Sequence, residues 1–321
     1  GGGNDPLQAI GNIVINPLKL SPKGVPLWLN GTSRLQLTRQ PDGKTTLSGE
    51  IRLHEAGAGD IDLDRVSARF HSEGDTVQVP RLHISAYGGN VVAENTRMEL
   101  KTGDWDMEVQ YSHVDLESLM GGFGIQGREA PGGVLRGSLN LAGAKLNPEA
   151  LKGRGEVRID RGRLYSFPVL LSVFSVLDLG LPSQDPVSDA FGSYTLGNGQ
   201  LTIENLVFSG GGSMPVHITG NIQLEEGVKF KNQRLSLLVT VTKRRGLLDA
   251  IPIVGFIKHY TIDLLRQFIM QARVKGTFVD YDVSTIADPV TKPVKAIWSL
   301  LPKLNPLSGR SDEPAPVPPK P

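Results

Sequence analysis

The chain has 321 residues, a net charge of +1 and no cysteine. The lack of cysteine excludes disulfides, thiolate metal sites and cysteine nucleophiles, and the near-zero net charge gives no general attraction for nucleic acid. Apolar residues make up 39% and aromatic residues 6%, which is lean for a compact enzyme, and the length suits two ordinary domains or one elongated β structure.

The first third of the chain alternates apolar and polar residues in short runs, which predicts strands with one apolar and one polar face. The turn sequence at 41–44, Pro-Asp-Gly-Lys, predicts a hairpin between two such runs. We therefore expect an upstream β-sheet segment over 1–121, ending in a short helix over 114–120. The expected strands are 10–15, 33–39, 46–53, 61–70, 76–85, 90–100 and 104–113.

After a glycine-rich stretch at 121–133, the same alternation predicts a second β domain over 122–285. Its expected strands are 134–142, 153–164, 192–196, 200–208, 214–224, 233–242 and 271–285. Helices are expected near 167–179, with Ser166 as the N-cap and Pro168 in the first turn, and near 246–270. An amphipathic helix is expected within 286–304, and the Pro-rich segment 305–321 should be a disordered tail.

One glycine-centred strand phrase recurs at 47–53, 135–141, 153–159, 218–224 and 274–280. Leu-Ser-Gly-Glu-Ile-Arg-Leu and Leu-Arg-Gly-Ser-Leu-Asn-Leu are the two clearest copies. Glycine within a strand permits sharp bending and the close approach of neighbouring atoms. A long sheet with one continuous apolar face must close on itself, pack on helices or hold an apolar ligand.

Residue patterns for catalysis or metal binding are missing from the sequence. The six histidines are scattered, with no pair spaced to share one helical face, and no Gly-x-Ser-x-Gly elbow occurs. We therefore expect no enzyme activity, no metal and no cofactor. The tight basic cluster Lys243-Arg244-Arg245 follows a strand and precedes an apolar helix, which fits either anionic head groups or a solvated helix flank.

Several ordered motifs of the second half are similar to one protein family. The runs 130–143 and 151–164, the hairpin sequence 191–206, and the closing segments 274–278 and 288–289 resemble the C-terminal region of AsmA-family proteins. The resemblance covers roughly residues 85–300, and TamB and YhdP are relatives within the same group of bridge-like lipid transfer proteins. It implies a mainly β fold: an elongated, strongly curved antiparallel sheet forming an open trough, with a few amphipathic helices towards the C-terminus.

The same resemblance implies a non-enzymatic lipid-binding or lipid-transfer segment of the bacterial cell envelope. Phospholipid acyl chains would lie in an apolar β-groove between the inner and outer membranes. The implied partners are phospholipid, a membrane surface and an inner- or outer-membrane protein, with no nucleic acid. The implied location is the periplasm, which cysteine-free composition also suits, with an inner-membrane anchor helix upstream of this sequence.

Strand alternation selects the residues expected to line the groove. They are Leu135, Leu139, Leu141, Val157, Ile159, Leu201, Ile203, Val216, Ile218, Ile222, Leu224, Leu235, Leu237, Val239 and Val241. A second set is expected to dock the end of the groove to a membrane: Lys243, Arg244, Arg245, Lys292, Lys295 and Trp298.

Periodicity alone leaves one rival open. A closed β core that binds protein partners, as an envelope scaffold, has the same alternation as an open trough.

Overall fold

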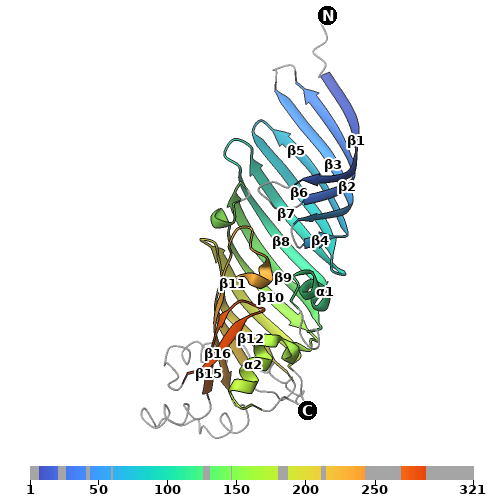
Figure 1. Ribbon diagram of the computed structural model, residues 1–321. Helices are drawn as coiled ribbons and strands as arrows, with labels where there is room; N and C mark the ends of the chain where they lie inside the picture. The colour runs from blue at the N-terminus through green and yellow to red at the C-terminus, as the bar shows by residue number, and fades with distance from the viewer. Residues whose placement is uncertain are drawn as a thin grey trace, which may run out of the picture.

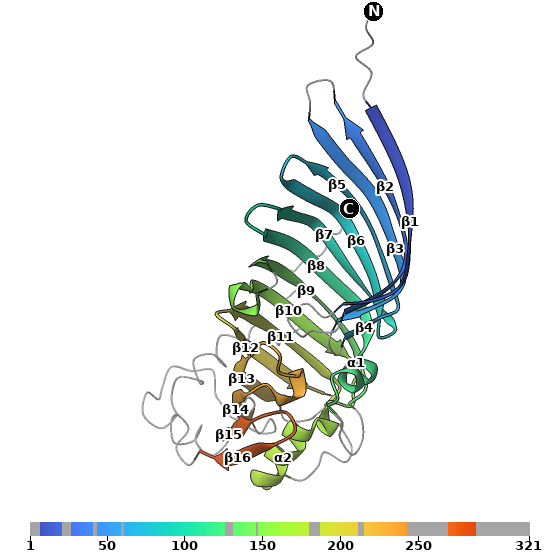
Figure 2. The same cartoon turned by 45° about the horizontal axis from the view of Figure 1, so that its top comes forward.

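The computed structural model describes residues 7–20, 27–40, 44–58, 61–125, 131–145, 147–179, 187–210, 215–242 and 269–286. Within these ranges the chain forms one 16-stranded antiparallel sheet whose strands follow one another in chain order, with the short β4 paired to β3 beside that path. Figures 1 and 2 show an elongated, strongly curved sheet whose first and last strands lie at opposite ends. The expected fold, a curved antiparallel sheet forming an open trough, is confirmed.

The strands in chain order are β1 (Leu7–Leu20), β2 (Leu27–Arg39), β3 (Thr45–Ala58), β4 (Ile61–Leu63), β5 (Arg65–Glu73), β6 (Thr76–Ala86), β7 (Gly89–Glu99), β8 (Asp104–Asp115), β9 (Val134–Ala144), β10 (Lys152–Asp160), β11 (Asp189–Gly197), β12 (Gln200–Ser209), β13 (Val216–Gln223), β14 (Leu235–Thr242), β15 (Ile269–Gly276) and β16 (Tyr281–Thr285). β8 pairs with β9 along its length, so one sheet runs through both expected segments, 1–121 and 122–285.

Two expected strands are each broken in two. The strand expected over 61–70 is divided at Asp64 into β4 and β5, and the one expected over 271–285 is the hairpin β15–β16. In that hairpin turn, Thr277 Oγ1 accepts a hydrogen bond from the Asp280 amide (3.0 Å), and Gly276 has φ 132°. The alternation changes phase in this turn, where Phe278 and Val279 are consecutive apolar residues, and the expectation of one continuous strand overlooked that change.

The curvature arises where the register between neighbouring strands shifts. Shifts occur in the pairings β1/β2, β2/β3, β5/β6, β7/β8, β8/β9, β11/β12 and β12/β13. At two of them Asn95 and His113 take left-handed backbone angles, φ 53° and 57°. Because an extra residue on one strand bends it and increases its twist, these bulges turn a flat ladder into a trough.

The connections of the sheet supply the helices. α1 (Leu116–Gly122) follows β8 directly, and its N-cap Asp115 accepts a hydrogen bond from the Ser118 amide (2.8 Å). α2 (Pro168–Val176) lies within the β10–β11 connection, with Pro168 in its first turn as expected. Short 3-10 turns occupy η2 (Pro148–Ala150), η3 (Leu164–Ser166) and η4 (Phe230–Asn232).

The prediction that Ser166 caps α2 is wrong. Its hydroxyl instead donates to the Arg163 carbonyl (2.6 Å), because the residue belongs to the preceding 3-10 turn. Phe167 occupies the N-cap position without a side-chain bond. Among the described residues, no helix has both the length and the apolar character needed to cross a bilayer.

Candidate functional site

Strand register places the aliphatic side chains on one face of the sheet, called here the apolar face. A representative row that runs in register across β5–β10 is Val66, Ile84, Val91, Tyr111, Gly137 and Val157. The adjacent row on the outer face is Ser67, His83, Val92, Gln110, Ser138 and Glu156. Because side chains alternate between the two sides of a strand, the first row lines a largely apolar surface and the second a largely polar one.

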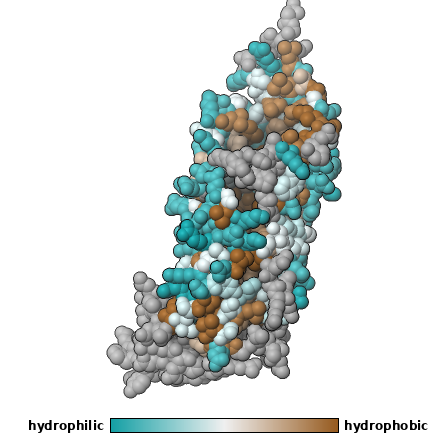
Figure 3. Space-filling view, viewed as in Figure 1, coloured by the Kyte–Doolittle hydropathy of each residue, from teal (hydrophilic) through white to brown (hydrophobic). Residues whose placement is uncertain are grey.

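The apolar face of β1–β9, called here the open trough, is incompletely covered. Near its edges Ile13, Leu37 and Met98 are 48%, 45% and 37% exposed. Deeper positions such as Ile51 and Val109 are half-buried. Figure 3 shows apolar residues gathered over the N-terminal strands at the top, with further apolar patches towards the lower end. Apolar surface left open over several strands is typical of ligand or partner binding.

The apolar face of β10–β16, together with α1 and α2, forms a packed core called here the closed end. Leu170, Val173 and Phe174 of α2 are at most 4% exposed and join one cluster with apolar residues of β10–β15. α2 also contacts β15 and β16, and the Ser172 and Tyr281 hydroxyls lie 3.0 Å apart. The sheet therefore wraps around α2, which makes the apolar face its concave side at this end.

Three aromatic rings join the segments that enclose this core. The Phe123 and Phe230 ring centroids are 4.9 Å apart, and those of Phe230 and Phe278 are 5.1 Å apart. These residues follow α1, lie in η4 and lie in the β15–β16 turn. The Phe278 amide also donates to the Lys231 carbonyl (3.1 Å). Ring stacking and this bond tie the last hairpin to the middle of the chain.

The predicted lining residues that lie in strands all fall on the apolar face, but the structure divides them between the two regions. Half-buried positions on β9 and β10 are Leu135, Leu139, Leu141 and Val157. Half-buried residues that pack against the closed-end cluster are Leu201, Ile203, Leu224 and also Leu135. Positions buried within that cluster are Ile159, Val216, Ile218, Ile222, Leu235, Leu237, Val239 and Val241. A ligand in the open trough could thus reach Leu139 and Leu141 without displacing the core.

Sequence reasoning missed the lining of β1–β8. Apolar-face residues there include Leu47, Ile51, Phe70, Leu82, Met107 and Val109. The signal that could have found them is the same alternation, which was present in every strand expected before residue 113.

The expected membrane-docking residues Lys243, Arg244, Arg245, Lys292, Lys295 and Trp298 lie outside the described residues. The helices expected near 246–270 and within 286–304 lie almost wholly outside them as well. Residues 269 and 270, expected in the first of these helices, begin strand β15 instead.

The two faces differ in charge as well as in hydropathy. On the outer face, Asp160 forms ion pairs with Arg158 (2.8 Å) and Arg136 (2.9 Å). The hydrogen bond from Arg158 lowers the pKa of the Asp160 carboxyl, and the charge of Arg136 adds to the effect. Exposed pairs of this kind add little stability, but they keep the outer face solvated.

Two tyrosines place hydroxyl groups on the apolar face. Tyr111 on β8 reaches over β9 and donates its hydroxyl to the Glu156 carbonyl on β10 (2.8 Å). Burial raises the pKa of the Tyr111 phenol, and the adjacent Tyr194 raises it further. Burial also raises the pKa of Tyr194. Both phenols therefore stay neutral near pH 7 and place no charge on the apolar face.

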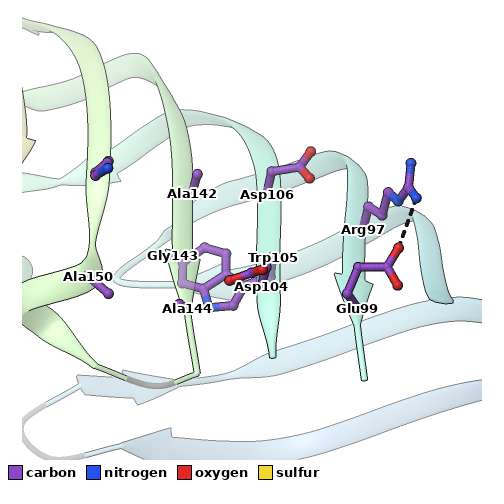
Figure 4. A pocket seen from close by; sticks show the side chains of 10 residues that line it. Arg97, Glu99, Asp104, Trp105, Asp106, Ala142, Gly143, Ala144 and Ala150 are labelled. Atoms are coloured by element: carbon purple, nitrogen blue, oxygen red, sulfur yellow. Dashed lines mark hydrogen bonds and ion pairs between the residues drawn. The ribbon is translucent and has the colours of Figure 1, made fainter. Parts of the chain in front are cut away.

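Two shallow recesses lie near strand ends. The first, about 480 Å³, is lined by Arg97, Glu99, Asp104, Trp105, Asp106, Ala142, Gly143, Ala144, Ala150 and Lys152. Figure 4 shows its Arg97–Glu99 ion pair (2.8 Å) and the Trp105 indole beside Gly143. The second, about 460 Å³, is lined by Glu149, Asn198, Gly199, Gln223, Leu224, Glu225 and Glu226. Over the described ranges, no three His, Asp or Glu side chains gather as a metal site would require.

Comparison of the chain with protein-family models, curated proteins and solved structures found no match.

Proposed function

We propose that this chain binds phospholipid acyl chains in the open trough, as a non-enzymatic lipid-transfer segment of a bacterial envelope. The observation that carries the proposal is one apolar face, continuous over eight successive strands from β1 to β9 and left partly exposed, on a sheet whose other face is polar. Each methylene group that leaves water for such a surface gains about 0.8 kcal/mol. A chain of ordinary lipid length is therefore held by this surface without any specific polar contact.

The proposal extends to the family and the compartment. The resemblance of 130–164 and 191–206 to AsmA-family proteins supports a periplasmic location between two membranes, with a membrane surface and a membrane protein as partners. The head group would remain in water at the open side of the trough.

Native mass spectrometry of protein purified in mild detergent tests the proposal. The wild-type chain should carry phospholipid, and Leu139→Glu should reduce that load because it places a charge on the trough floor. Ser138→Glu is the matched control, since Ser138 lies on the outer face of the same strand, β9. A wild-type chain free of lipid, or equal loads in both variants, would contradict the proposal.

The closed end favours a second candidate, a scaffold that binds protein. Val216, Val239, Val241 and Val274 are fully buried there, as in an ordinary core. A protein partner would then cover the apolar face of β1–β9. In that case the purified chain should lack lipid and should bind its partner through residues such as Leu37 and Met98.

A further inference from the structure

Four aromatic rings on the apolar face lie against a glycine of the neighbouring strand. The pairs are Phe70/Gly49, Trp105/Gly143, Tyr111/Gly137 and Tyr194/Gly155, and each pair is directly opposite in the strand register. They are distributed from β3/β5 to β10/β11, so they follow the sheet from strand to strand. The glycines at 49, 137 and 155 are the central residues of the recurring strand phrase, which the proposed function did not otherwise explain.

In these pairs the ring occupies the space that a side chain on the glycine would need. A Cβ atom at Gly143 would lie 2.7 Å from Trp105 Cζ2, and one at Gly155 would lie 2.6 Å from Tyr194 Cζ. Figure 4 shows the Trp105 indole lying beside Gly143. The Trp105 Nε1–H donates to the Lys145 carbonyl (2.9 Å), which holds the indole in this position.

A ring that leans over a glycine does not stand up from the sheet. The glycine provides the room, and the ring covers backbone that would otherwise be bare, as in aromatic rescue of strand glycines. The apolar face thus keeps its depth and presents flat ring surfaces. Such surfaces suit a slender polymethylene chain, which gains contact along its length and meets no obstruction.

We propose that the three of these aromatic–glycine pairs that lie in the open trough are contact sites for the linear acyl chains of a lipid. This inference rests on the proposed function and assigns the residues that shape its binding surface. Phe70, Trp105 and Tyr111 contact the methylene groups, and their partner glycines keep the rings reclined. Tyr194, on β11, belongs to the closed end.

Trp105 allows the most direct test, because another tryptophan–glycine pair lies on the opposite face. Trp28 covers Gly57 and lies opposite Lys19 in the strand register. The next residue, Leu29, is on the apolar face, so Trp28 is on the outer face. Trp28→Phe/Trp298→Phe leaves Trp105 as the single tryptophan, and Trp105→Phe/Trp298→Phe leaves Trp28. Phospholipid brominated along its acyl chains should quench the fluorescence of Trp105 and leave that of Trp28 unchanged.

Glycine variants test the shape of the surface. At both Gly143 and Gly57 the nearest atoms to an added Cβ belong only to the tryptophan ring. Gly143→Ala should raise the indole into the trough and reduce bound phospholipid by roughly fivefold, an effect typical of overpacking by one methyl group. Gly57→Ala should leave the load unchanged, because Gly57 and Trp28 lie on the outer face.

Removal of the obstructing ring should restore binding. Trp105→Leu/Gly143→Ala should carry more lipid than Gly143→Ala alone, because the smaller side chain at 105 leaves room for the added methyl group. If wild-type protein carries lipid but Trp105 and Trp28 are quenched alike, the inference is overturned while the proposed function stands. If wild-type protein carries and binds no lipid, both are overturned. The quenching measurement decides the question even if Gly143→Ala fails to fold.

Discussion

The open trough and the closed end are built from the same strand pattern but differ in what covers them. In both, aliphatic side chains alternate with polar ones, and strands pair in chain order. At the closed end α1 and α2 fill the concave side, so Val239 and Val241 are fully buried. Over β1–β9 comparable residues such as Val109 stay half-exposed. Alternation thus identifies the apolar face, whereas the helices in the connections decide which part of it is free for a ligand.

The largest expected effect separates the two regions with one substitution. Val239→Asp should destabilise the protein by at least about 4 kcal/mol, because it buries an unpaired carboxyl between Ile218 and Ala272. Val109→Asp, in the open trough, should destabilise by no more than about 2 kcal/mol. Urea unfolding measures both changes. Equal losses would show that the two regions are packed alike.

Truncation of phenylalanines should give the next largest contrast. Phe174→Ala in α2 removes a ring that is 4% exposed and should lower the free energy of unfolding by about 3–5 kcal/mol. Phe70→Ala in the open trough should lower it by about 1 kcal/mol, because that ring is only half-buried. Thermal unfolding followed by circular dichroism compares the two variants. A larger loss at Phe70 than at Phe174 would reverse the assignment of core and trough.

The helix α1 lies at the border between the open trough and the closed end, and Asp115 is its N-cap. Asp115→Ala removes the acceptor of the Ser118 amide and should reduce stability by about 1 kcal/mol. Asp115→Asn keeps a capping oxygen and should retain most of that stability. Hydrogen exchange of the α1 amides measures the local change. If exchange is unaltered in Asp115→Ala, the capping bond does not hold α1 in place.

The smallest expected effect is a pH dependence confined to the closed end. Burial lowers the pKa of His217 on β13 below its ordinary value of 6.5, and its cross-strand neighbours Val207 and Thr240 do not titrate. The unfolded chain therefore binds a proton more readily than the folded chain, so stability is complete above about pH 6.5 and declines below it. Urea midpoints at about pH 7.5 and about pH 5.5 measure the decline.

His217→Gln should reduce the difference between those two midpoints. The matched control is His83→Gln, at an exposed position on the outer face of β6. A difference that stays the same in His217→Gln would assign the acid sensitivity to other groups.

Much of the fold could be predicted from sequence because strand alternation and turn residues are local signals. The apolar face of β9, with Leu135, Leu139 and Leu141 in phase, follows directly from period two. The β15–β16 hairpin was missed although its turn at 277–280 interrupts the alternation with the consecutive apolar residues Phe278 and Val279. Periodicity does not show the backbone angle of Gly276 at that turn, φ 132°.

The candidate site was predictable only in part. Sequence placed Ile218 and Leu139 on the same face, but not in different environments. Ile218 is covered because α2 folds back over the sheet from the β10–β11 connection, a contact between residues far apart in the chain. The aromatic–glycine pairs depend on cross-strand register, which periodicity within one strand does not fix.

The proposed function requires acyl chains to lie on the apolar face of β1–β9. Photo-crosslinking tests this requirement. Benzoylphenylalanine is introduced singly at Ile51, at Met107 and, on the outer face, at Gln110. The protein is expressed in cells whose membranes supply phospholipid. We expect phospholipid adducts at Ile51 and Met107 and none at Gln110. Adducts on both faces alike, or none at Ile51 and Met107, would contradict it.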